Sequence, residues 1–95
     1  MTGMTKLSQS DIDVLLSHRK NWTIEDEKLT RVFKFNDFVT AFAFMTKVAL
    51  IAEKLDHHPE WFNVYSTVRI QLSSHEVNGL SANDFQLAER IDQLV

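Results

Sequence analysis

The sequence predicts a two-layer α+β sandwich, and three observations support this prediction. The apolar residues alternate between helical and strand spacing, giving the order helix, strand, strand, long helix, long strand, helix. Only two glycines and one proline interrupt the chain, so we expect mostly regular structure. The chain has 95 residues, of which 44% are apolar, so we expect a single domain over 1–95.

The first part of the chain predicts a helix followed by a hairpin. Residues 8–18 carry one apolar stripe, and Ser8 is placed to cap the helix. Polar and apolar residues alternate over 21–25 and again over 29–35, as in half-buried strands. The charged segment 25–28 separates the two runs, so we expect an antiparallel hairpin.

The long helix is expected from Phe38 to Leu55, with Asn36 or Asp37 as its N-cap. It has two apolar stripes: Phe38, Phe42, Met45, Ala49 and Ala52 form one, and Phe44, Val48, Ile51 and Leu55 form the other. A helix with two apolar stripes must be buried on two sides. The sheet can cover one stripe, and the first helix, the last helix or a second subunit can cover the other. Because the domain is small, we expect self-association.

Residues 63–74 read as a strong strand that is long enough to kink into two, so the sheet has three or four strands. Val64, Val68, Ile70 and Leu72 are expected on one face of this strand. A turn signal follows at residues 78–79, and Ser81 with Asp84 has capping-box spacing at the start of the last helix.

Three of the four histidines, His57, His58 and His75, lie near the only proline, Pro59. Carboxylates accompany them at Glu53, Asp56 and Glu76. Histidine exchanges protons near neutral pH, because its unperturbed pKa is about 6.5. The pattern is therefore typical of an acid–base site.

A shared histidine site makes a geometric demand on the chain. Pro59 disfavours helix before it, so His57 and His58 are expected at the helix end or in the following loop. His75 follows a strand of ten residues or so, which spans about 30 Å if it is straight. The loop must therefore fold back, or the strand must bend.

Spacing alone leaves three interpretations of the histidines open. They are surface residues near helix and strand ends, or zinc ligands together with Asp56 or Glu53, or proton carriers without a metal. The aromatic side chains of Trp61, Phe62 and Tyr65 could stack on a flat heterocycle or pack within the fold.

Composition excludes several classes of protein. With no cysteine, the chain has no disulfide and no thiolate zinc site. The net charge of −3 and the dispersed Arg31, Lys47 and Arg69 argue against direct nucleic-acid binding. The apolar stretch 38–52 is too short to span a bilayer, and residues 1–6 lack a signal-peptide core, so we expect no membrane contact and a cytoplasmic location.

Taken in order, these residues resemble the pterin-4a-carbinolamine dehydratase family. The resemblance covers roughly residues 30–92 and includes the run 42–50 of the long helix. The matching positions are Glu53, His57, His58, Pro59, Trp61, Asn63, Tyr65, Val68, Leu72, Ser74, His75, Gly79, Leu80, Ser81 and Asp84.

The resemblance implies a four-stranded antiparallel sheet with helices on one face. It also implies dehydration of 4a-hydroxytetrahydropterin to quinonoid dihydropterin and water, a step in tetrahydrobiopterin recycling. No metal and no cofactor are implied, because the pterin is the substrate. His57 and His75 become the acid–base candidates, and His58 holds the pterin. The rest of the pocket is formed by Asp56, Ser73, Ser74 and Glu76, with Glu53 orienting a histidine.

The resemblance also implies partners. Family members assemble as homodimers or homotetramers, and animal members bind a homeodomain transcription factor through the long helix and can be nuclear. A dimerisation or coactivator module is therefore the alternative function. Val77 departs from the cysteine of some animal members, but it touches no proposed proton carrier.

Overall fold

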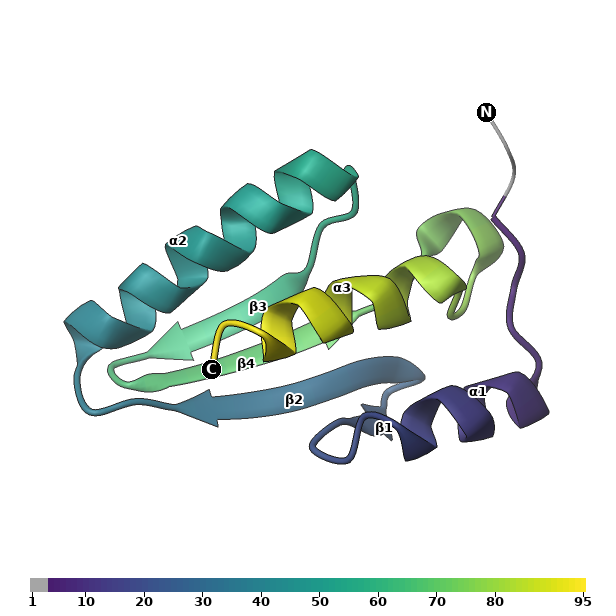
Figure 1. Ribbon diagram of the computed structural model, residues 1–95, viewed down its shortest axis with the longest axis horizontal. Coiled ribbons are helices and arrows are strands. Elements are labelled where there is room, and N and C mark those ends of the chain that lie inside the picture. The colour runs from purple at the N-terminus through teal and green to yellow at the C-terminus, as the bar shows by residue number, and fades with distance from the viewer. Residues whose placement is uncertain (1–3) are drawn as a thin grey trace.

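A computed structural model of the protein describes residues 4–95. Its elements in chain order are α1 Gln9–Ser17, β1 Thr23–Glu25, β2 Lys28–Lys34, α2 Phe38–Leu55, β3 Glu60–Val64, β4 Thr67–Leu72, the 3₁₀ turn η1 His75–Val77 and α3 Ala82–Asp92 (Figure 1). Residues 1–3 lie outside the described residues. They include the start of the expected domain 1–95 and half of the segment 1–6, which was expected to lack a signal-peptide core.

The four strands form one antiparallel sheet in the order β1-β2-β4-β3, and α2 and α3 lie together on one face of it (Figure 1). This confirms the predicted α+β class. The helix-facing side chains of β2 and β4 are buried: Leu29, Phe33, Val68, Ile70 and Leu72. On the opposite face Val32, Phe62 and Val64 are exposed, so the described chain has a single core between the sheet and its helices.

The prediction of one strand over residues 63–74 is wrong: there are two strands, as the alternative allowed, but they are joined by a hairpin turn instead of a kink, and the first begins at Glu60. Val64 pairs with Thr67, so the chain reverses through a two-residue turn, Tyr65–Ser66. Tyr65 has φ 50°, a left-handed conformation that glycine or asparagine usually takes. The turn places Val64 on the exposed face, opposite to Val68, instead of on the same face.

This hairpin meets the geometric demand made by the histidines. Glu60, at the start of β3, pairs with Gln71, near the end of β4. The segment after β4 therefore returns to the segment before β3, and residues 73–75 lie beside residues 57–59. The sequence required either a loop that folds back or a bent strand, and the structure instead reverses the whole chain through a hairpin.

The two apolar stripes of α2 have different environments. The second stripe lies on the core, with Phe44 and Val48 buried. The first stripe does not stay together: Ala52 is buried and Met45 packs on the core, whereas Phe38 and Phe42 are exposed. The exposed side of the helix, here called the outer stripe, consists of Phe38, Val39, Phe42 and Leu50. The α1 helix lies at the β1 end of the sheet, where Ile12, Leu15 and Leu16 pack on the core. Neither α1 nor α3 covers the outer stripe of α2.

Within residues 4–95, no helix combines the length and the hydropathy that a membrane crossing requires.

The N-cap of α2 is Asp37, and it provides a pH-dependent test of the fold. The backbone N–H of Thr40 donates to its carboxylate at 2.7 Å and holds the pKa of Asp37 below its usual 3.8. A lowered folded-state pKa stabilises the protein above pH 3.8, and that stabilisation is lost as the pH falls through the folded value.

We therefore expect Asp37→Ala to lower the urea midpoint at pH 6, and the gap from the wild type to shrink between about pH 4 and pH 2. Asp37→Asn is the matched control, because an uncharged cap keeps the hydrogen bond. Its gap from Asp37→Ala should not vary with pH. A wild-type to alanine gap that stays constant from pH 6 to pH 2 would contradict this account.

Candidate active site

The way α2 ends buries one of the paired histidines and leaves the other exposed. Asp56 follows the helix in the left-handed conformation, φ 53° and ψ 42°, and the N–H of His57 donates to the carbonyl of Ala52 at 3.0 Å. This is a Schellman ending, which reverses the chain tightly after a helix. It turns His57 back beneath the helix end, where its exposure is 7%, and leaves His58 in solvent.

Buried His57 has a buried carboxylate partner. Its Nε2 lies 2.6 Å from Oδ1 of Asp84, a residue of α3 with no exposed surface. The other oxygen, Oδ2, accepts from the hydroxyl of Ser74 at 2.8 Å and from the N–H of Ser81 at 2.9 Å. Asp84 therefore connects the end of α2, the end of β4 and the start of α3 through one carboxylate.

This network selects the tautomer of His57. Ser74 and Ser81 both donate to Oδ2 of Asp84, and for an ionised carboxylate Oδ1 is also an acceptor, so we assign the imidazole proton to Nε2. The remaining nitrogen, Nδ1, makes no hydrogen bond to any residue among 4–95. It is the nitrogen of His57 that the Asp84 network does not use.

The other two histidines are exposed and held differently. His58 Nε2 lies 2.9 Å from Oε1 of Glu53 in the last turn of α2, and both side chains are largely in solvent. His75 begins η1, in a short loop closed at its base by hydrogen bonds between the backbones of Ser74 and Gly79. Asn78, at φ 52°, ends this loop.

A cavity of about 210 Å³ joins these parts. Its lining consists of Met4, Asp56, His57, His58, Ser73, Ser74, His75 and Glu76. All seven residues that the resemblance placed in the pocket therefore meet around one cavity, and Glu53 contacts it through His58. Among residues 4–95, no group of three or more histidine or carboxylate side chains is arranged to hold a metal ion.

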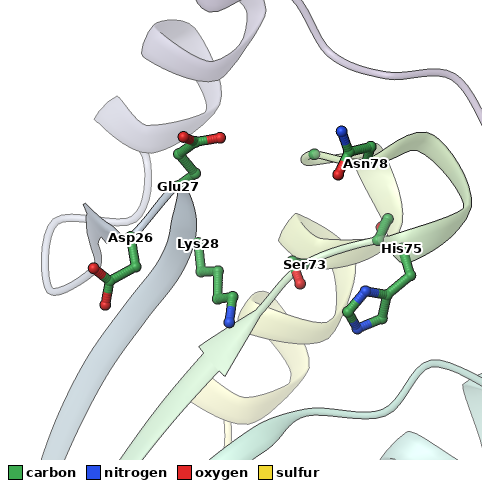
Figure 2. Close-up of a pocket in the computed structure, with 8 residues that line it drawn as sticks. Asp26, Glu27, Lys28, Ser73, His75 and Asn78 are labelled. Carbon is green, nitrogen blue, oxygen red and sulfur yellow. The ribbon is translucent and has the colours of Figure 1, made fainter.

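A second cavity, of about 180 Å³, shares Ser73, Ser74 and His75 with the first. Its opposite wall is formed by Asp26 and Glu27 of the β1–β2 turn and by Lys28 at the start of β2, whose amine points toward Ser73 (Figure 2). The segment 73–75 thus divides two hollows, both open to solvent.

Two residues of this region were missed by the sequence reasoning. Asp84 was recognised as a helix cap and as a position that matches the family, but not as a partner of His57; the cap is confirmed, because Ser81 and Asp84 form a capping box. Its contact with His57 joins positions 27 residues apart and has no local signal. Met4 was missed because nothing in the first residues predicts their docking. The aromatic residues Trp61, Phe62 and Tyr65 do not line the histidine cavity.

The fold and the site define a small α+β protein with a histidine-rich cavity, in which one imidazole is held by a buried carboxylate. The family described as Pterin 4 alpha carbinolamine dehydratase matches residues 5–94 of the chain. The chain belongs to this family, and the resemblance found in the sequence is confirmed.

Individual relatives are similar over nearly the whole chain. A protein of Solibacter usitatus, provisionally named a pterin-4-alpha-carbinolamine dehydratase, is 52% identical over 90 residues, which are 95% of each chain. A protein of Prochlorococcus marinus MIT 9303 with the same name is 49% identical, over 95% of this chain and 94% of its own. A crystal structure described as a transcriptional coactivator/pterin dehydratase from Brucella melitensis has a TM-score of 0.91 and 43% identity, and covers 95% of this chain and 98% of its own.

The tautomer of His57 can be tested by replacing its partner. In Asp84→Asn, the amide oxygen should stay with the donors of Ser74 and Ser81, so the amide NH₂ faces Nε2 of His57. We expect His57 to move its proton to Nδ1, as seen in imidazole ¹⁵N shifts at about pH 8.5, where histidine is neutral. Glu53→Gln, which changes the exposed pair, should leave the His57 signals unchanged. An Nε2–H tautomer in Asp84→Asn would show that the carboxylate does not set it.

Proposed function

We propose that the protein dehydrates 4a-hydroxytetrahydropterin to quinonoid dihydropterin and water by histidine acid–base catalysis, without a metal or a cofactor. The observation that supports this most is the cavity in which His57, His58 and His75 meet, with His57 fixed by Asp84. Membership of the family supports the same reaction.

The reaction requires two proton transfers and no change of oxidation state. The bond from C4a to the hydroxyl oxygen breaks, a proton delivered to that oxygen lets it leave as water, and a ring nitrogen loses a proton. A positioned acid or base contributes typically about 10²- to 10⁴-fold to each transfer. Two imidazoles at one cavity supply both partners, because histidine is populated in both protonation states near neutral pH.

His57 and His75 are the proposed proton carriers, and they differ in burial. His57 is buried and held by Asp84, so its Nδ1 has a set direction. His75 is exposed on a short loop, in contact with solvent. His58, oriented by Glu53, is proposed to hold the pterin, with Asp56, Ser73 and Glu76 as further polar contacts.

We expect His57→Ala and His75→Ala each to lower kcat for carbinolamine dehydration by 10²-fold or more, because each removes a proton carrier. Stopped-flow absorbance with freshly generated carbinolamine measures this rate directly. His18→Ala, far from the cavity in sequence and fold, is the control and should keep the wild-type rate. Near-normal turnover in both site variants, with circular dichroism unchanged, would eliminate the mechanism.

A second candidate function is a dimerisation or coactivator module, and the exposed stripe of α2 favours it. Phe42 is 56% exposed and Leu50 68% exposed, next to Phe38 and Val39 on the same helix. The similar Brucella structure is described with both activities. We propose that this stripe associates with a second copy of the chain, giving a homodimer or homotetramer, or with a partner helix.

Phe42→Glu should lower the molar mass measured by light scattering, because it places a charge in the proposed apolar contact. Thr40→Ala and Lys47→Ala, at exposed positions of α2, test whether a partner helix also contacts it. The histidine variants are the control and should retain the wild-type mass. An unchanged mass in Phe42→Glu would show that self-association, if present, uses another surface.

A further inference from the structure

The histidine cavity has one apolar side chain in its lining. Seven of the eight lining residues are carboxylates, imidazoles or hydroxyls, and the eighth is Met4. The pyrimidine ring of a pterin is flat, with its hydrogen-bonding groups around its edge. In the 4a-hydroxy substrate the hydroxyl stands on one face at the ring junction, so only the opposite face has none. Polar side chains suit the edge, but a ring face packs best against an apolar and polarisable surface.

We propose that Met4 is the ring-face contact of this site, and that it selects planar heterocycles and sets the plane in which the histidines meet them. This inference rests on the proposed function, since it assumes a pterin in the cavity. The thioether is suited to the role, because sulfur–aromatic contacts are favourable and the unbranched side chain adapts to its neighbour. No aromatic side chain among residues 4–95 competes for it, since Trp61, Phe62 and Tyr65 lie outside the lining.

The segment that carries Met4 is docked. The N–H of Leu7 donates to the carbonyl of Leu80 at 2.8 Å, and the Leu7 side chain packs on the core. The Lys6 side chain crosses Gly79 so closely that a Cβ on that residue would lie 2.8 Å from Lys6 Cε. Gly79 thus admits the N-terminal segment to the base of the His75 loop.

Met4 is also placed against the network that holds His57. Its Sδ lies 3.7 Å from Oγ of Ser81, whose hydroxyl is 2.7 Å from that of Ser74. The thioether therefore lies on the wall formed by the start of α3. A ring packed on Met4 would lie against this wall with its edge open to the imidazoles, so Met4 acts on orientation and affinity and not on proton transfer.

The test measures binding and turnover in wild type, Met4→Ala, Met4→Leu and the control Thr5→Ala. A 7,8-dihydropterin, followed by fluorescence, serves as the binding probe. Met4→Ala should weaken binding and raise KM by about threefold to tenfold, with kcat within about twofold, because the proton carriers are unchanged. Met4→Leu should recover most of the affinity, and Thr5→Ala should match the wild type.

An oxidation footprint distinguishes direct contact between Met4 and the pterin from a purely structural role of Met4. Bound dihydropterin should slow the oxidation of Met4 by hydrogen peroxide, followed by mass spectrometry, and leave Met45 on α2 unaffected. Wild-type affinity in Met4→Ala, or oxidation of Met4 at the same rate with and without the probe, overturns the inference. If the wild type binds the probe with Met4 protected but does not turn over carbinolamine, the proposed reaction fails and the Met4 contact stands.

Discussion

The carboxylate of Asp84 is the interaction on which the rest of the site depends. It is fully buried and hydrogen-bonded to His57 after α2, to Ser74 after β4 and to Ser81, the N-cap of its own helix. A buried carboxylate is tolerated only when its lone pairs are satisfied. The Ser81 contact forms with the helix itself, but His57 and Ser74 come from other elements, so the complete network requires the tertiary fold. The imidazole of His57 is therefore oriented by tertiary structure, and the site is organised before any ligand binds.

Backbone geometry gives the three histidines different exposure to solvent. Adjacent in sequence, His57 and His58 have opposite environments because the left-handed Asp56 turns the first beneath the helix and leaves the second in solvent. His75 reaches them only because β3 and β4 form a hairpin. Buried and exposed imidazoles thus meet at one cavity.

The sequence predicted α2 at its observed bounds, because the Asp37 cap and the apolar periodicity mark both ends. It did not predict the β3–β4 turn, because Tyr65 in a left-handed conformation carries no turn signal and tertiary pairing imposes it. The histidines could be recognised as a group from their types and spacing. The contacts of Asp84 and Met4 could not, because both depend on long-range packing with no periodic or local pattern.

The strand register of β4 has a consequence for how this chain can change in length. Side chains of a strand alternate between faces, so Leu72 and Ser74 point inward while Ser73 points outward. Losing or gaining one residue in β4 would exchange the two serines and direct the wrong hydroxyl toward Asp84. Changes of two residues, matched in β3, would preserve the parity. Changes of an even number of residues therefore keep Ser74 directed toward Asp84. The number of residues between the paired histidines and His75 can then change only by multiples of the two-residue repeat of the strand.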